Sequence, residues 1–191
     1  MRSDARAKRG DILQSAWGMY AEKGPEVPMR AIAQAARVGI ATLYRHFPTP
    51  DDLLVGVLGE AFSRVAAITR EHLECWDDDP ARAWTGLVRA LGALEFGALA
   101  YQVEARVLSS STLRSSVDGH ADPARALVSE ACDRARREGL LDEDVSAERF
   151  FSGLAIVTRP LPHVMEQLLP DQRAWLVDTY IRGLRPADRP A

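Results

Sequence analysis

The stretch that decides the fold reads VPMRAIAQAARVGIATLYRHF and occupies residues 27–47. Apolar residues recur within it at helical spacing in two short runs, and the second run ends at the aromatic Phe47. Arg37-Val38-Gly39 stands between the runs and predicts a tight turn. Two short helices joined by such a turn are typical of a helix-turn-helix.

The second helix of this pair carries side chains that suit contact with DNA. Ala33 and Ala36 allow the two helices to approach closely, and Val38, Leu43 and Phe47 are expected to fix their angle. The side chains left to face a major groove, which admits one helix, are Ile40, Ala41, Thr42, Tyr44, Arg45 and His46. A plain αα-hairpin that buries both faces stays open as the alternative.

Charge is distributed unevenly along the chain. Residues 1–50 carry eight basic side chains against four acidic ones, whereas the remaining residues carry 16 basic against 23 acidic. A basic head on an acidic body indicates that the head meets a polyanion. A solvated basic face is the other interpretation of the charge alone.

Helical periodicity continues along the rest of the chain, with almost no strand signal. A stripe from Ile12 to Tyr20 ends at Gly24-Pro25. Thr49-Pro50-Asp51-Asp52 then has the composition of a helix start, with a Thr cap, Pro first and acids in the first turn. The helix expected from there toward Trp76 is roughly 37 Å long, which is enough to join two lobes.

The C-terminal part shows further helix-start and helix-end signals of the same kind. Further helix starts are expected at Asp79-Pro80, Asp122-Pro123, Ser146 and Pro170. The first of these helices is expected to continue to Leu99, the second to a cap near Gly139, and the third to an interruption around Pro160 and Pro162. Ser109–Thr112 predicts a loop.

These signals predict an all-α protein of about eight or nine helices. An N-terminal three-helix helix-turn-helix head, residues 1–50, is expected to bind DNA. A long helix joins it to a C-terminal helical bundle, residues 51–191.

Composition and missing motifs exclude several other classes of protein. No apolar run reaches the ~18 residues of a membrane span, and the first residues are charged rather than apolar, so neither membrane nor export is expected. The two cysteines, Cys75 and Cys132, fit a reducing cytoplasm. No nucleotide-binding, hydrolase or metalloprotease motif occurs, so we expect no enzyme activity, cofactor or metal.

Some charged residues leave a choice of interpretation. Glu95, Glu104 and Arg106 fall within predominantly apolar helices, where they either orient a ligand or form a structural salt bridge. A helical-bundle enzyme or an interaction module without DNA binding is the competing class for the whole chain. Such a protein needs a reactive group of residues in the body, and the sequence offers none.

The stretch from Val27 to Phe47 closely resembles the TetR family of bacterial one-component regulators. The preceding helix end, Tyr20-Ala21-Glu22-Lys23-Gly24, and the later pair Leu53-Leu54 match as well. Beyond these residues the body matches the family in length and helix content alone. The resemblance implies a DNA-binding regulator, most often a repressor, that acts as a homodimer in the cytoplasm.

The resemblance also implies roles for single residues. Tyr44 and His46 match positions that bind backbone phosphates, and Thr42 matches one that reaches a phosphate or a base edge. Ala41 matches a small residue that touches bases, such as a thymine methyl, and Arg30 one that reaches a guanine. We expect Arg45 to read a base or to hold a second phosphate. Gln34, on the first helix of the pair, belongs to the same candidate set.

Three residues depart from the family pattern. The usual turn Gly is Arg37, which makes a left-handed backbone less favourable there, and the usual Ser cap is Gly39, a weaker cap. The usual Lys at the start of the fourth helix is Pro50. Phosphate contacts are then expected from the third helix, the N-terminal arm and the backbone amides of the fourth helix.

The body is expected to hold a small hydrophobic or aromatic effector and a second copy of the chain. The candidate ligand-binding residues are Phe62, Val65, Trp84, Leu87, Leu91 and Tyr101. The candidate dimer interface comprises Phe151, Leu154, Ala155, Thr158, Leu176, Tyr180 and Leu184. A dimer places two recognition helices about one DNA turn, ~34 Å, apart on a palindromic operator of double-stranded DNA. An effector that tilts the long helix is expected to release the repressor.

Overall fold

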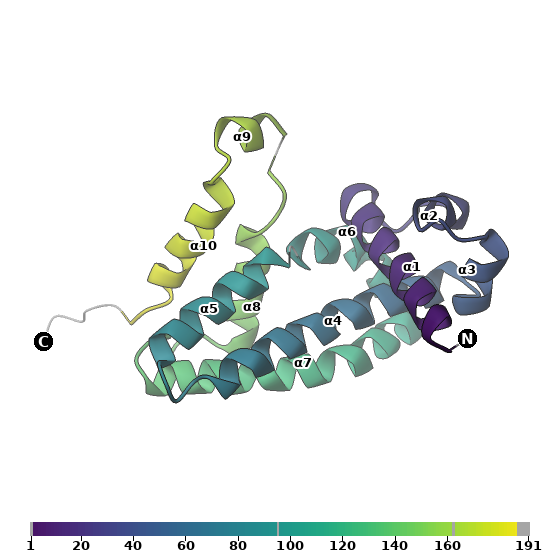
Figure 1. Cartoon of the computed structure of the whole chain (residues 1–191). Helices are drawn as coiled ribbons and strands as arrows, with labels where there is room; N and C mark the ends of the chain where they lie inside the picture. The colour runs from purple at the N-terminus through teal and green to yellow at the C-terminus, as the bar shows by residue number, and fades with distance from the viewer. Residues whose placement is uncertain (1, 95, 162, 187–191) are drawn as a thin grey trace, which may run out of the picture. The chain divides into compact units, whose positions relative to one another are not determined.

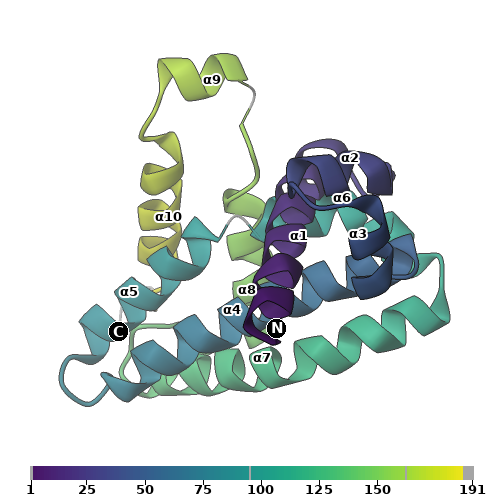
Figure 2. The same ribbon diagram turned by 45° about the vertical axis from the view of Figure 1, so that its right-hand side comes forward.

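A computed structural model describes residues 2–94, 96–161 and 163–186 of the chain. Across these residues the chain forms ten helices and no strand, so the predicted all-α class is confirmed (Figures 1 and 2). The chain divides into two compact units, Met1–Ser63 with Leu99–Ala121 and Arg64–Ala98 with Asp122–Ala191. The sequence places its domain boundary at residue 50, whereas the first unit also includes the start of α4, most of α6 and the start of α7.

The first unit contains the predicted helix-turn-helix. Its elements are α1 (Arg2–Lys23), α2 (Met29–Ala35), α3 (Ile40–His46), and parts of α4 (Pro50–Glu74), α6 (Phe96–Leu108) and α7 (Ser111–Arg137). Ile12, Tyr20, Ile32, Leu43 and Val57 are at most 1% exposed and form its core. The apolar stripes predicted from the sequence are therefore the helix faces that pack in the core of this unit.

The helix ends of the first unit follow local signals. Gly24 adopts φ 81° after α1, and its N–H donates to the Tyr20 carbonyl at 2.9 Å. At the start of α4, the Thr49 hydroxyl accepts from the Asp52 N–H at 3.1 Å, and the Asp52 carboxylate accepts from the Thr49 N–H at 3.0 Å. This reciprocal cap satisfies two backbone donors and confirms the helix start predicted at Thr49-Pro50.

Glycine at position 56 brings α4 close to the end of α3. A Cβ on Gly56 would lie 2.7 Å from Cε1 of Phe47 and 3.1 Å from Cδ2 of Leu13. Phe47 itself is 2% exposed. The helix-turn-helix therefore packs directly against the α4 backbone through the Phe47 ring.

The second unit is a helical bundle. It contains α5 (Pro80–Ala93), α8 (Ala147–Val157), α9 (His163–Leu168), α10 (Gln172–Gly183) and the remaining parts of α4, α6 and α7. Asp79 and Ser146 cap α5 and α8 by accepting from the N–H groups of Arg82 and Arg149. Trp84, Leu87 and Phe150 are at most 2% exposed at its centre.

Two sequence predictions about the helices after residue 79 are wrong, and one helix was not predicted. The helix from Pro80 does not continue to Leu99 but ends at Ala93, where Gly92 and Gly97 lower helix propensity on both sides of the break. Pro123 does not start a helix but lies inside α7, which runs from Ser111 to Arg137. The helix α9 has no counterpart among the expected elements.

The Pro123 ring is tolerated within α7 because of the residue one turn earlier. A proline ring normally clashes with the carbonyl of the residue four positions before it and removes that hydrogen bond. Here that residue is Gly119, which is exposed, so its carbonyl can turn toward water. The interruption expected around Pro160 agrees with the end of α8 at Val157, while Pro162 lies outside the described residues.

Candidate DNA-binding site

The turn between α2 and α3 is closed by Arg37 in a left-handed conformation, with φ 55°. The Val38 N–H donates to the Ala33 carbonyl at 3.0 Å, and the Arg37 N–H donates to the Gln34 carbonyl at 3.1 Å. These two bonds form a Schellman motif, which glycine usually closes. The backbone therefore keeps the conformation that a turn glycine would supply, even though this chain has arginine there.

The recognition helix α3 is anchored from below by two apolar side chains. Leu43 is 0% exposed and Phe47 is 2% exposed, as the sequence predicts. Gly39 precedes α3 in extended backbone and supplies no side-chain cap. The start of α3 is instead held by the Gly39 carbonyl, which accepts from the N–H groups of Thr42 and Leu43 at 2.9 and 3.1 Å.

The opposite face of α3 is open to solvent. Ile40 is 41% exposed and Tyr44 is 47% exposed, although buried Leu43 lies on the same helix. The other exposed candidates are Arg30, Gln34, Ala41 and Arg45, while Thr42 and His46 are half-buried. Every residue that the sequence assigns to DNA contact therefore lies on or at the rim of an accessible surface.

A basic side chain from α1 supports the end of α3. The guanidinium of Arg9 lies over the Phe47 ring, 5.0 Å from its centroid, and the His46 and Phe47 ring centroids are 6.4 Å apart. A cation held over an aromatic face is attracted by the ring quadrupole. Arg9 is thus placed beside the C-terminal end of the recognition helix, where it adds positive charge. Arg9 is not among the residues that the sequence pattern assigns to DNA contact.

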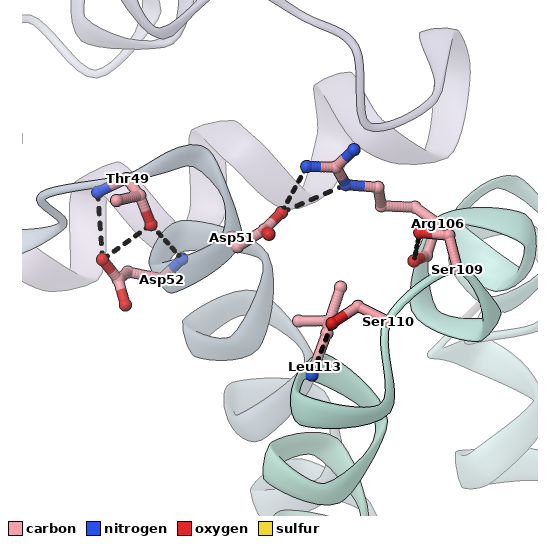
Figure 3. A network of polar contacts seen from close by, with 7 residues as sticks. All are labelled: Thr49, Asp51, Asp52, Arg106, Ser109, Ser110 and Leu113. Carbon is pink, nitrogen blue, oxygen red and sulfur yellow. Dashed lines mark hydrogen bonds and ion pairs between the residues drawn. The ribbon is translucent and has the colours of Figure 1, made fainter.

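The start of α4 does not offer all the free backbone amides that the sequence predicts for phosphate binding. The Asp52 N–H is already bonded to the Thr49 hydroxyl, and the Asp51 and Asp52 carboxylates occupy the first turn (Figure 3). Negative charge at this helix end stabilises the helix but repels a phosphate. The remaining candidates for phosphate contact are α3, Arg30 and the basic residues of α1.

Asp51 is held by an arginine from a distant part of the sequence. The Arg106 Nη2 and Nε groups on α6 donate to Asp51 Oδ1 at 2.8 and 3.1 Å (Figure 3). Of the two interpretations that the sequence left open for Arg106, the structure shows the salt bridge. Glu104 is exposed, and Glu95 lies outside the described residues.

Burial raises the pKa of three groups away from the α3 face. The pKa of Tyr20 rises to about 12, mainly through burial and then through the charges of Asp51 and Glu26. The pKa of Cys132 and that of Tyr180 also rise to about 12, again mainly through burial. All three side chains therefore stay neutral at ordinary pH, and Cys132 is a poor nucleophile.

The predicted ligand-binding residues divide between the two units. Phe62 and Tyr101 belong to the first unit, where Tyr101 is 59% exposed on α6 and so does not line an interior. The buried candidates of the second unit are Val65, Trp84, Leu87 and Leu91. The expectation of a single apolar set that includes Tyr101 is therefore corrected.

An aromatic cluster that the sequence only partly indicated surrounds Trp84. Its ring centroid lies 6.4 Å from that of Trp76 and 5.1 Å from that of Phe150, which in turn lies 6.3 Å from that of Tyr180. The indole N–H groups of Trp76 and Trp84 are buried and have no hydrogen-bond partner within the described residues. Buried donors without a partner are rare in proteins, so these two indoles distinguish this cluster from an ordinary apolar core.

Several predicted dimer-interface residues pack inside their own chain. Leu154, Thr158 and Leu184 are at most 4% exposed, and the Thr158 hydroxyl donates to the Leu154 carbonyl at 2.8 Å. The Tyr180 hydroxyl donates to the Phe150 carbonyl at 2.6 Å. A Cβ on Gly153 would lie 2.9 Å from Cζ of Tyr180, so this ring covers α8.

The remaining predicted interface residues, Phe151, Ala155 and Leu176, are half-buried. The exposed apolar side chains of this region are Ile156 on α8, Val164 and Leu168 on α9, Leu169, and Trp175 on α10, between 44% and 69% exposed. Leu154, Thr158 and Leu184 are therefore buried within their own chain, which corrects the expectation that these three side chains face a second copy. Helical periodicity gives the spacing of an apolar stripe without showing which of two apolar faces is covered.

Neither a membrane span nor a metal site is found among the residues that the structure describes. No helix in those ranges is long and apolar enough to cross a bilayer. The same residues include no group of three or more His, Cys, Asp or Glu side chains placed to hold a metal ion.

The fold and the exposed face of α3 define a helix-turn-helix protein with a helical body. Residues 12–57 match the family model of bacterial regulatory proteins of the tetR family. The HTH-type transcriptional repressor KstR of Mycobacterium tuberculosis is 45% identical over 65 residues, which are 34% of this chain and 30% of that repressor. The match to this curated relative thus spans less than a third of the relative's length.

Solved structures extend the likeness to the body. A TetR transcription regulatory protein of Mycobacterium vanbaalenii is 29% identical with a TM-score of 0.65, covering 97% of this chain and 99% of that one. A TetR transcriptional regulator of Streptomyces coelicolor is 26% identical with a TM-score of 0.64, covering 94% and 99%. Residues 12–57 therefore match the tetR family of bacterial regulatory proteins, and the described chain shares its fold with these solved TetR regulators.

Proposed function

We propose that this protein is a transcriptional repressor that binds a palindromic operator as a homodimer and leaves it when a small hydrophobic or aromatic effector binds. The observation that carries the proposal is the α3 helix, which is anchored by fully buried Leu43 and yet presents Ile40 and Tyr44 to solvent. An exposed face on a rigid helix is what major-groove readout requires. The KstR proteins that match residues of this chain are transcriptional repressors, which supports repression rather than activation.

The DNA contacts divide by chemistry. Tyr44, His46 and Thr42 are proposed to bind phosphates, and Arg45 reads a base or binds a second phosphate. Ile40 and Ala41 meet apolar base edges such as a thymine methyl. Arg30 and Gln34 reach the same groove from α2. DNA lies in the bacterial cytoplasm, so the repressor acts there.

Dimerisation is proposed to use the exposed apolar side chains of α8, α9 and α10. Ile156, Leu168 and Trp175 are more than half exposed, and so large a set on one region marks an interaction surface. A two-fold copy buries this surface isologously. Two heads then present two α3 helices to successive grooves of a palindrome.

Effector binding is proposed in the second unit at Val65, Trp84, Leu87 and Leu91. The support is an apolar interior with two unpartnered indole donors, which favours an effector with an apolar body and one hydrogen-bond acceptor. Val65 lies on α4, whose first turn follows α3, so a tilt of this helix can move the head. A coupling free energy of about 1–3 kcal/mol is enough to weaken operator binding 5- to 150-fold.

The test is DNA binding to the region upstream of the protein's own gene, measured by fluorescence anisotropy against unrelated DNA of equal length. Tyr44→Phe and Arg45→Ala are expected to weaken specific binding, and loss of a phosphate contact reduces the slope of log affinity against log salt by about one. The matched control is Arg137→Ala, which removes an exposed arginine on α7 in the other unit. It is expected to leave the operator affinity and its salt dependence unchanged. Equal affinity for both DNAs in the wild-type protein overturns the proposal.

A further inference from the structure

The ion pair between Arg106 and Asp51 lies within the unit that contains the recognition helix. Two nitrogens of the Arg106 guanidinium donate to one oxygen of Asp51, at 2.8 and 3.1 Å (Figure 3). The Arg106 and Asp51 side chains are 42% and 44% exposed. Asp51 is the second residue of α4, and only Phe47, Pro48, Thr49 and Pro50 separate it from the end of α3.

The positive charge of Arg106 interacts with two acidic residues of the first unit, Asp51 and Glu26. The Asp51 hydrogen bond and charge raise the pKa of Arg106, and the Glu26 charge adds to them. Asp51 and Glu26 also both raise the pKa of the buried Tyr20 beneath them. Charges from the α1–α2 connection, from α4 and from α6 therefore meet at one place.

The helix α6 reaches the head through a second polar side chain, one turn before Arg106. The Oε1 atom of Gln102 lies 3.6 Å from where a Cβ on Gly24 would stand, at the turn that ends α1. The end of α6 is itself fixed, because the Ser109 hydroxyl donates to the Arg106 carbonyl at 2.7 Å and Ser110 caps α7 (Figure 3). Arg106 is therefore presented to Asp51 from a defined helix end.

We infer that Arg106 is a positioning residue for DNA recognition, which acts through Asp51 and does not itself bind DNA. It holds the first turn of α4 in place behind α3, and it neutralises acids that otherwise repel nearby phosphates. An exposed ion pair adds little to folding stability, so this role is expected to appear in operator affinity rather than in unfolding. The inference rests on the DNA-binding function proposed above.

A double-mutant cycle on operator affinity tests the inference, with Arg106→Gln, Asp51→Asn and the double variant of the full-length protein. We expect Arg106→Gln to weaken operator binding roughly fivefold. In the Asp51→Asn background the same substitution is expected to change affinity less than twofold, because the acid through which Arg106 acts is gone. Arg106→Lys, which keeps the charge, is expected to restore most of the affinity.

The matched control is Arg114→Gln, which removes an exposed arginine of the same unit that donates to the Leu108 carbonyl rather than to a carboxylate. The inference is overturned if Arg106→Gln and Arg114→Gln weaken binding equally, or if Arg106→Gln weakens it equally in both backgrounds. A fall in melting temperature beyond that of the control also overturns it, because the residue is then structural. If the wild-type protein binds no specific DNA, the proposed function fails; if it binds and Arg106→Gln is unchanged, this inference alone fails.

Discussion

Arg37 and Gly139 close the same helix-ending motif in two different units of the chain. Gly139 adopts φ 66° after α7, with bonds from Leu140 N–H to the Ala135 carbonyl at 2.8 Å and from Gly139 N–H to the Arg136 carbonyl at 3.0 Å. Arg37 adopts φ 55° after α2 with the same pair of bonds. One motif has the residue that the conformation favours, and the other has a residue with a Cβ.

Arg37→Gly is therefore expected to stabilise the protein by about 1 kcal/mol, because glycine adopts the left-handed conformation without a steric cost. The reverse substitution, Gly139→Arg, is expected to destabilise it by a similar amount, since space around Gly139 is open and only the backbone opposes a side chain. Melting temperatures of the two variants and the wild-type protein check both signs. A lower melting temperature for Arg37→Gly contradicts the prediction.

Gly97→Ala is expected to destabilise the second unit strongly, by roughly 2 kcal/mol or more. A Cβ on Gly97 would overlap the backbone carbonyl of Ala155 on α8, and backbone cannot move aside as a flexible side chain can. Gly18→Ala is the matched control, because nothing lies within 4 Å of its Cβ position in α1. The control is expected to stabilise α1 by a few tenths to 1 kcal/mol. Chemical denaturation measures the free energy of unfolding of both variants. Equal changes in the two variants contradict the prediction.

Ile156→Glu and Trp175→Glu are expected to give a folded monomer, because both side chains are more than half exposed. Leu154→Glu is expected to unfold the second unit instead, since Leu154 is 3% exposed and a buried carboxylate has no partner there. Sedimentation velocity reports the association state and circular dichroism reports the fold. A folded, fully dimeric Ile156→Glu/Trp175→Glu variant rules out this surface.

The unpartnered indole donors predict which small molecules bind the second unit. Acetophenone and α-methylstyrene have nearly the same shape, but only the ketone accepts a hydrogen bond. We expect the ketone to bind roughly five- to tenfold more tightly, as one hydrogen bond contributes about 1 kcal/mol. The preference should shrink in Trp84→Phe and persist in Trp175→Phe, whose indole is 55% exposed. Shifts of the indole N–H signals in NMR titrations measure both affinities, and equal affinities in the wild-type protein contradict the prediction.

The parts of the fold that could be predicted from sequence are those that local chemistry determines. Thr49, Ser146 and Gly139 satisfy helix ends within a few residues of themselves, so their patterns are readable without the rest of the chain. The α3 face was readable for a related reason, because buried Leu43 fixes which of its neighbours point outward.

The sequence could not determine features that depend on distant partners. Leu154 and Ile156 are both apolar residues of α8, and only tertiary packing determines that Leu154 is the buried one. Asp51 and Arg106 are 55 residues apart, so neither hydrogen bond between them follows from helical spacing. Pro123 carried a misleading local signal, because its effect depends on the exposed Gly119 one turn earlier.

Pro123 also has a consequence for the mechanics of α7. A proline cannot donate the backbone bond that stiffens a helix, and the residue one turn before it is the least restrained kind, a glycine. This weak point lies next to Ala121 and Asp122, where the chain passes from one compact unit to the other. The resistance of α7 to bending is therefore reduced in the turn from Gly119 to Pro123, within an otherwise continuous helix of 27 residues.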